Sequence, residues 1–208
     1  MKKIGIIDYT VGNIGSIMNA FSYIGYDPFL VKTKKDIKSS KLLVLPGVGS
    51  FGSGMQGLKN LSLIDELNYQ VTYNKKPILG LCLGMQLFFT SSEEDKTLNG
   101  LGWINGKIEK LSNVKNQFPI PHVGWSDVVW KNNSILSPDK RKSCFYFVHS
   151  YGLLNEPDNC YIECTTNYGQ NIITGVRKEN IVGLQFHPEK SQDDGLNLLQ
   201  QWVSEFNG

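Results

Sequence analysis

A cysteine between two glycines is the strongest chemical signal in this sequence. Cys82 lies in the run Gly80-Leu81-Cys82-Leu83-Gly84, directly after the apolar residues 77–79. We expect this run to end a buried strand, turn sharply and begin a helix over residues 85–90, because glycine tolerates the strained backbone of such a turn. A helix N-terminus favours a thiolate over a thiol, so the pattern predicts a nucleophilic Cys82. The alternative is an unreactive cysteine buried beside a helix end.

A thiol nucleophile needs a base, and the sequence contains three histidines. His187 ends a predicted strand, and Glu189 follows two positions later. Side chains two positions apart in an extended chain point the same way, so this carboxylate could fix the imidazole tautomer and stabilise its charged form. His122 and His149 are rival bases, but neither has an acidic residue at this offset. The sequence therefore predicts a triad of Cys82, His187 and Glu189.

A second glycine-rich segment follows the preceding predicted strand. Residues 42–45 lead directly into Pro46-Gly47-Val48-Gly49. The carboxyl ends of neighbouring parallel strands line one crevice. Backbone N–H groups of this loop and of Leu83 could therefore form an oxyanion hole. The alternative is an ordinary turn, in which Pro-Gly pairs are common.

The order of the predicted elements indicates an α/β fold in one domain over residues 1–208. In the first half, apolar strands alternate with helices, which predicts a mostly parallel central sheet flanked by helices on both faces. The predicted strands are 3–9, 29–31, 42–45 and 77–81, and the predicted helices are 12–25 and 58–73. After residue 100, short strands separated by Gly and Asn turns predict an antiparallel extension of the sheet. These strands are 127–130, 144–149, 160–166, 172–176 and 181–186, followed by a helix over 196–206.

Length and composition are typical of a globular domain. The 208 residues are 40% hydrophobic and 19% charged, enough for a sizeable core. A net charge of +2, with basic residues scattered along the chain, gives no reason to expect a nucleic-acid or membrane partner. No stretch approaches the ~18 apolar residues of a membrane span, and Asp8 interrupts the apolar N-terminal run. We therefore expect a cytoplasmic protein.

The cysteines do not indicate a disulfide framework or a metal site. Four cysteines are few for a chain of this length. Cys160 and Cys164 lie four positions apart in a predicted strand, so strand alternation predicts that both lie on one buried face. No second pair of ligands has the spacing that a zinc site requires.

The cysteine run and the segment His187-Pro188-Glu189 resemble the class I (triad-type) glutamine amidotransferases. Within that family, the sequence is similar nearly end to end to the glutaminase subunit of imidazole glycerol phosphate synthase, the histidine-pathway enzyme. Four further segments carry the likeness. They are residues 45–51, 121–125, 147–151 and 186–191.

The resemblance implies hydrolysis of glutamine to glutamate and ammonia. In such a reaction Cys82 attacks the side-chain amide through a tetrahedral oxyanion and forms a glutamyl thioester. His187 protonates the departing ammonia and then activates water, while Glu189 orients the imidazole. The resemblance assigns the backbone N–H groups of Val48 and Leu83 to the oxyanion.

The resemblance also implies a glutamine pocket and a partner. The implied substrate-binding residues are Gly47, Gly49, Gln86, His149, Ser150 and Tyr151. Ammonia that escapes into water becomes ammonium, which is useless as a nucleophile. The implied partner is therefore a (β/α)8-barrel synthase subunit, which forms a heterodimer, receives the ammonia and makes imidazole glycerol phosphate and AICAR. Trp125 and Lys190 match family positions near that interface. No cofactor and no metal are implied.

Two positions depart from the family pattern. Thr10 stands where the family usually has glycine, and Ser126 where it usually has asparagine. Both lie in segments associated with the subunit interface. A paralogous subunit that supplies ammonia for amidino-sugar synthesis in surface polysaccharides is therefore an alternative. The same fold could also serve as a catalytically silent binding module. A cysteine peptidase or hydrolase would fit the triad, although it leaves Gln86 and Lys190 unexplained.

Overall fold

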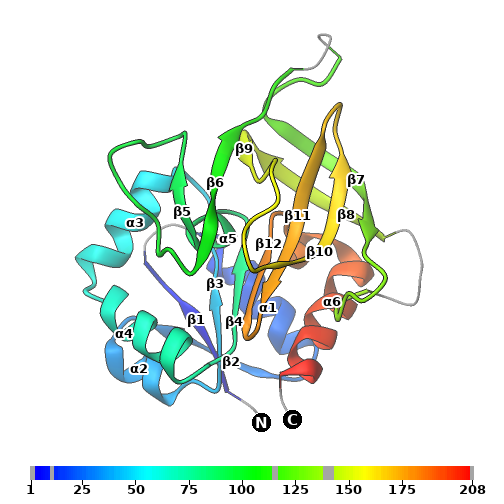
Figure 1. Cartoon of the computed structure of the whole chain (residues 1–208). Helices are drawn as coiled ribbons and strands as arrows, with labels where there is room; N and C mark the ends of the chain where they lie inside the picture. The colour runs from blue at the N-terminus through cyan, green and yellow to red at the C-terminus, as the bar shows by residue number, and fades with distance from the viewer. Residues whose placement is uncertain (1–2, 10–11, 114–116, 138–142, 207–208) are drawn as a thin grey trace.

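A nine-stranded sheet forms the centre of the chain. The computed structural model describes residues 3–9, 12–113, 117–137 and 143–206. The strands of this sheet are β1 (Lys3–Ile7), β2 (Asp27–Val31), β3 (Leu42–Leu45), β4 (Ile78–Leu81), β7 (His122–Trp130), β8 (Ser143–His149), β10 (Tyr161–Asn167), β11 (Asn171–Lys178) and β12 (Ile181–Leu184). Within the described residues their order is β2-β1-β3-β4-β12-β11-β10-β7-β8 (Figure 1).

The sheet has a parallel half and an antiparallel half. Strands β2, β1, β3, β4 and β12 pair in parallel. Strands β11, β10, β7 and β8 continue the sheet with antiparallel pairs. The predicted fold class is confirmed, with an antiparallel extension as extensive as the parallel part. Because β3, β4 and β12 are parallel neighbours, their carboxyl ends open onto one crevice.

Helices cover both faces of the parallel half. They are α1 (Ile14–Tyr23) and α6 (Gln192–Glu205) on one face, and α2 (Lys34–Ser39), α3 (Phe51–Asn60) and α4 (Ile64–Asn68) on the other (Figure 1). Strand β1 contributes side chains to the hydrophobic clusters on both faces of the sheet. Ile4 and Ile6 pack with α1 and α6, whereas Ile7 packs with α3 and α4. This is why the strand is apolar at nearly every position. None of the described helices is long and apolar enough to cross a bilayer.

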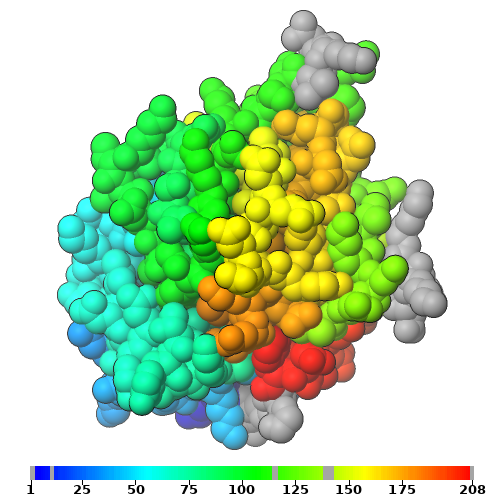
Figure 2. Space-filling model, in the orientation of Figure 1, coloured from blue at the N-terminus to red at the C-terminus, as the bar shows by residue number. Residues whose placement is uncertain are grey.

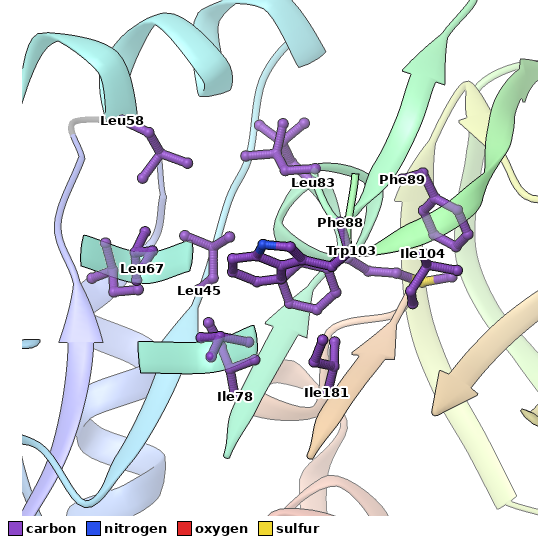
Figure 3. Packing of buried hydrophobic residues seen from close by; sticks show 14 of the residues in the cluster. Leu45, Leu58, Leu67, Ile78, Leu83, Phe88, Phe89, Trp103, Ile104 and Ile181 are labelled. Carbon is purple, nitrogen blue, oxygen red and sulfur yellow. The ribbon is translucent and has the colours of Figure 1, made fainter. Parts of the chain in front are cut away.

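The residue that follows the predicted nucleophile is anchored in the core. Figure 3 shows the Leu83 side chain directed into the hydrophobic cluster, above the ring of Trp103. Trp103 packs against Phe88 with ring centroids 5.1 Å apart, and its indole N–H donates to the side chain of Asn68 at 2.8 Å. The buried cluster therefore fixes the position at which the chain turns after Cys82.

Three predicted helices have the wrong boundaries, and the C-terminal one begins at Gln192, four residues before its predicted start. The helix predicted over 58–73 begins earlier, as α3, and is interrupted before α4 and a π-helical turn over Tyr69–Tyr73. Ser62 interrupts it with φ 53°, a conformation that no helix interior accepts. Ser50 marks the true start, because its hydroxyl accepts the N–H of Ser53. The helix expected over 85–90 is a single turn, α5 (Leu83–Gln86).

A small second sheet was not predicted from the sequence. It contains β5 (Phe89–Ser92), β6 (Ile104–Lys110) and β9 (Tyr151–Gly152), in the order β5-β6-β9. Figure 2 shows the segment after β9, in yellow, lying between β6 and the orange strands on this face. Strand β6 has only two fully buried residues, Ile104 and Ile108, so its apolar pattern is weak. Helix α2 was also missed, although Thr33 and Asp36 form a capping box at its start.

Cys160 and Cys164 do not share a buried face, contrary to the prediction. Cys160 precedes β10 and packs against the cluster beneath α3 and α4, whereas Cys164 belongs to the cluster beneath α1 and α6. The pairing of β10 with β11 shifts register on both sides of Cys164. A one-residue shift turns the following side chains to the opposite face of a sheet, which explains the error. All four cysteines are free thiols.

We expect Gly84→Ala to destabilise the fold by about 3 kcal/mol, as overpacking against an immobile neighbour does. A Cβ at this position would lie 1.8 Å from the carbonyl oxygen of Leu45, a backbone atom that cannot move aside without distorting β3. Gly15→Ala is the matched control, since a Cβ there meets nothing within 4 Å, and we expect it to stabilise helix α1 by ~0.5 kcal/mol. Urea unfolding measures both. Equal free energies of unfolding for the two variants would contradict the packing argument.

Candidate active site

Cys82 occupies the sharp turn between β4 and α5. Its backbone has φ 51° and ψ −107°, a conformation that costs a non-glycine residue about 1–3 kcal/mol. Two hydrogen bonds hold it, since the Cys82 N–H donates to Leu184 O at 2.8 Å and the Gln86 N–H donates to Cys82 O at 3.2 Å. The close contacts that a Cβ at Gly80 or Gly84 would make confirm that this turn needs glycine on both sides. The strained turn presents the thiol at the crevice.

His187 and Glu189 form a buried pair beside the cysteine. The His187 Nδ1 and Glu189 Oε1 atoms lie 2.7 Å apart, and the two side chains are 3% and 1% exposed. The predicted pairing is present, but the predicted extended geometry is wrong. Residues 188–190 form a 3-10 turn, which returns the carboxylate to the ring. The other ring nitrogen, Nε2, is buried without a hydrogen-bond partner among the described residues.

The surroundings of His187 favour its protonated form. Burial by itself lowers the pKa of His187, but the interactions with Cys82 and Glu189 outweigh burial and raise this pKa to about 10. The Cys82 Sγ atom also lies 3.8 Å from Val148 O and 3.7 Å from the side-chain nitrogen of Gln185. The fold thus brings a thiol, an imidazole and a carboxylate from distant segments into one cleft.

The predicted oxyanion hole is not formed in this conformation. The Leu83 N–H donates to Gly47 O at 3.3 Å. In a trans peptide the C=O and N–H point in opposite directions, so the Val48 N–H points away from Leu83. The loop is held from behind by Tyr9, a fully buried residue whose hydroxyl donates to Pro46 O at 2.5 Å. One predicted donor is therefore occupied and the other faces away.

A pocket of about 320 Å³ opens beside Cys82. Most of the residues predicted to bind substrate line it. They are Gly49, Gln86, His149, Ser150 and Tyr151, and both predicted oxyanion residues, Val48 and Leu83, lie on its wall. Gly47 is buried outside the lining, where its carbonyl group faces Leu83. The crevice at the strand ends is thus a real cavity, and its wall combines apolar side chains with backbone polar groups.

Glu94 lines this pocket and was missed from the sequence. It is the one acidic side chain among the lining residues. Its Oε2 atom accepts the N–H of Phe51, the first residue of α3, at 2.8 Å. In the sequence, Glu94 lies in the acidic run 93–95, which looks like an ordinary solvated loop. The preference of a helix N-terminus for a carboxylate is the signal that could have identified it.

Both amide hydrogens of Gln86 are already engaged by the protein. Its Nε2 atom donates to Tyr151 O at 2.9 Å and to the side-chain oxygen of Gln185 at 3.0 Å. Gln86 is 5% exposed. It therefore joins α5 to the segment after β8 and to the end of β12, the elements that surround the pocket.

Comparison with known proteins identifies the family. Residues 5–205 match the family described as glutamine amidotransferase class-I. The chain belongs to this family. It is 46% identical over 203 residues to imidazole glycerol phosphate synthase subunit HisH 2 of Methanococcus maripaludis, covering 97% of this chain and 99% of the relative. It is 41% identical over 207 residues to subunit HisH of Pelagibacter ubique, with 97% and 99% coverage. Within the class, it therefore belongs to the family of these HisH subunits.

Solved structures share the fold at much lower identity. A crystal structure of a glutamine amidotransferase superposes with a TM-score of 0.78 at 16% identity, covering 99% of both chains. A chain of the PurLQS structure from Thermotoga maritima gives a TM-score of 0.74 at 19% identity, covering 98% of both chains. These likenesses establish that the α/β architecture is that of glutamine amidotransferases.

The residues predicted to contact a partner lie on an exposed patch near the triad. Trp125 is 48% exposed and Val123 is 53% exposed on the same side of β7. Trp125 is paired across the strands with Tyr146, whose ring lies 5.7 Å from the Lys190 ammonium. Tyr146 also lies beside His187, with ring centroids 6.5 Å apart. We call Val123, Trp125 and Tyr146 the outer apolar patch.

Of the two residues that depart from the family pattern, Thr10 and Ser126, the structure describes Ser126. Thr10 lies outside the described residues. Ser126 lies on β7, one position after Trp125, and its hydroxyl is 2.8 Å from His122 Nε2. The departure at Ser126 thus keeps a polar contact within the sheet.

We expect the three histidines to titrate far apart. Burial lowers the pKa of His122 to about 4 and that of His149 to about 3, whereas the pKa of His187 is about 10. At pH 7 an NMR titration of the ring protons should therefore show one imidazolium and two neutral rings. Three titrations near pH 6.5 would contradict the assignment.

The same shifts fix the sign of the pH dependence of folding. Because the pKa of His187 lies above its ordinary value of 6.5, its stabilisation is complete below pH 6.5 and is lost as the pH rises toward about 10. His122 and His149 act in the opposite sense, so their stabilisation is lost as the pH falls from 6.5 toward about 4 and about 3.

Proposed function

We propose that this chain hydrolyses glutamine to glutamate and ammonia, as the glutaminase subunit of an imidazole glycerol phosphate synthase. The observation that carries the proposal is the buried His187–Glu189 pair beside Cys82 at its strained turn. A binding module has no need for such a backbone conformation at a cysteine. The identity to HisH subunits over nearly the whole chain supports the histidine pathway as the destination of the ammonia.

The triad performs two half-reactions. His187 takes the thiol proton of Cys82 at Nε2, the sulfur attacks the side-chain amide carbon, and the carbonyl π electrons move to oxygen. As the oxyanion collapses, the C–N bond breaks, and the His187 imidazolium gives its proton to the departing nitrogen, which releases ammonia. Neutral His187 then takes a proton from water, the hydroxide oxygen attacks the thioester, and glutamate leaves. Glu189 holds Nδ1 throughout, so that Nε2 serves as the proton carrier.

Full activity requires a different oxyanion loop. While the Leu83 N–H is bound to Gly47 O, it cannot donate to a tetrahedral intermediate. Turning the Gly47–Val48 peptide frees Leu83 and directs the Val48 N–H to the same point. Each such donor contributes about 3–4 kcal/mol to the transition state. The structure therefore corresponds to a resting state, and we expect the isolated chain to be slow.

We infer that glutamine binds in this pocket with its amide at Cys82 and its amino-acid end toward Glu94, the acidic residue of the lining. A carboxylate is the natural partner of the α-ammonium group. Gly49 leaves the loop backbone accessible at the pocket, and His149, Ser150 and Tyr151 also line it, while Gly47 lies buried behind the lining. Gln86 holds the pocket wall through Tyr151 O.

The partner is a (β/α)8-barrel synthase subunit in a cytoplasmic heterodimer. The relatives are named as subunits of a synthase, which supports a partner for this chain. The outer apolar patch, next to the triad, is suited to bury a partner surface there, with Lys190 at its edge. A docked barrel would receive ammonia before it becomes ammonium.

A second candidate acceptor is the amidino-sugar synthase of a paralogous pair. Ser126 favours it, because this residue departs from the family pattern one position after Trp125, in a segment associated with the subunit interface. The two candidates share the glutaminase chemistry and differ only in the barrel that activates it. Mixing the chain with each type of barrel subunit and measuring glutamate release decides between them.

We expect Cys82→Ala to lower glutaminase activity at least about 1,000-fold, because no other group can form the thioester. Glutamate release is measured with the purified chain, alone and with barrel subunits. Cys144→Ala is the matched control, since Cys144 is a partly buried thiol outside the pocket lining, and it should retain activity. Activity that survives Cys82→Ala would eliminate the proposed nucleophile.

We expect Glu94→Gln to raise the KM for glutamine about 10-fold with little change in kcat, because it removes the charge that binds the α-ammonium group. Glutamine keeps an oxygen that can accept the Phe51 N–H, so helix α3 is preserved. Glu93→Gln is the control, because Glu93 pairs with Lys107 and does not line the pocket. If both variants have the same KM, Glu94 does not bind substrate.

A further inference from the structure

Two histidines outside the triad form a buried polar chain behind the pocket. Ser126 Oγ lies 2.8 Å from His122 Nε2, and His122 Nδ1 lies 3.1 Å from His149 Nε2. His149 Nδ1 in turn lies 2.9 Å from Tyr151 O. The exposed fractions of His122 and His149 are 1% and 6%. The proposed catalytic mechanism uses none of these three contacts.

The hydrogen-bond partners assign the protons along this series of contacts. Tyr151 O can only accept, so His149 carries its proton on Nδ1. Both rings are neutral at pH 7, because burial lowers both pKa values. His149 Nε2 is therefore an acceptor, which requires His122 to donate from Nδ1 and to accept the Ser126 hydroxyl at Nε2. In all three hydrogen bonds the donor is therefore on the side of Ser126 and the acceptor on the side of Tyr151.

This series of hydrogen bonds ends at Tyr151 O, which also contacts the residues around the pocket. Tyr151 O also accepts from Gln86 Nε2, which donates to the side-chain oxygen of Gln185 as well. The side-chain nitrogen of Gln185 lies 3.7 Å from the Cys82 sulfur, although 103 positions separate these residues. The carbonyl of Tyr151 is thus the point at which the histidine chain meets the groups around the nucleophile.

His122 is well placed to hold a fixed orientation. Its ring stacks on Tyr168 with centroids 3.9 Å apart and on Phe147 with centroids 4.6 Å apart. Gly124, which lies between His122 and Ser126 on β7, has φ 131°, a conformation open mainly to glycine. The ring cannot turn without losing stacking contacts as well as hydrogen bonds.

We propose that His122 is a positioning residue for the glutamine pocket, acting through His149 and the Tyr151 carbonyl on Gln86. This inference rests on the proposed glutaminase function. Among the residues that the His122 ring hydrogen-bonds to or stacks on, His149 is the one that lines the pocket, so His122 acts by fixing the tautomer of that ring. Gln86 and the wall around Tyr151 then meet glutamine in one arrangement.

The test compares His122→Phe with His122→Asn in the complex with the barrel subunit. Phenylalanine keeps the stacking but removes the donor to His149, whereas asparagine can place an N–H near the position of Nδ1. We expect His122→Phe to raise the KM for glutamine about 10-fold with kcat within about twofold, and His122→Asn to restore KM to within about threefold. Tyr69→Phe, at an exposed aromatic residue outside the pocket lining and outside the outer apolar patch, is the control and should match the natural chain.

Loss of folded protein gives a different result, because it lowers the apparent kcat and leaves KM unchanged. An unchanged KM in His122→Phe, or equal KM values in the phenylalanine and asparagine variants, would overturn the proposal. Nitrogen NMR of the natural chain provides a readout independent of activity. A proton on His149 Nδ1 supports the proposed series of hydrogen bonds from Ser126 to Tyr151, and a proton on Nε2 refutes it. If the natural chain is inactive in the complex with the barrel subunit, the proposed function is refuted. The NMR result then still decides the tautomer of His149.

Discussion

Parallel pairing of β4 with β12 is the constraint on which the site depends. Leu81 is in register with Leu184, so Cys82 and Gln185 leave the sheet side by side. The Cys82 N–H then donates to Leu184 O, which ties the strained turn to the strand that leads to His187. A shift of one residue in this pairing would turn every side chain of β12 to the other face. Burial of both faces beneath helices makes such a shift costly.

The backbone strain at Cys82 is held in place by rigid neighbours. A conformation that costs about 1–3 kcal/mol persists only if its surroundings leave no alternative. Here Leu83 is buried in the core, and Gly84 lies against the Leu45 carbonyl. The oxyanion loop is different, since it is held by a Leu83–Gly47 hydrogen bond that a single peptide rotation removes. Core packing thus fixes the turn at Cys82, whereas a hydrogen bond sets the orientation of the Gly47–Val48 peptide.

The electrostatic design divides the three histidines into two kinds. Burial lowers the pKa of His187, but its interactions with Cys82 and the Glu189 carboxylate outweigh burial, so it keeps its proton. Burial lowers the pKa values of His122 and His149, and the neighbouring His122 and His187 rings lower that of His149 further, so both lose theirs. A charged ring can carry a proton to a leaving group. A neutral ring donates a hydrogen bond from one nitrogen and accepts one at the other. All three histidines are buried, so burial alone does not decide which of them is protonated. The charge of the neighbouring group decides it.

The sequence determined the local chemistry of this protein. The glycines around Cys82, the offset between His187 and Glu189, and the continuously apolar strands are written in adjacent residues, so the turn, the pair and the parallel half could be predicted. Tertiary structure decided the rest. The 3-10 turn at residues 188–190 and the place of Glu94 in the pocket depend on neighbours distant in the chain. So do the bulge at Cys164 and the closed oxyanion loop. Short-range patterns specify which conformations are accessible, and long-range packing and hydrogen bonding select among them.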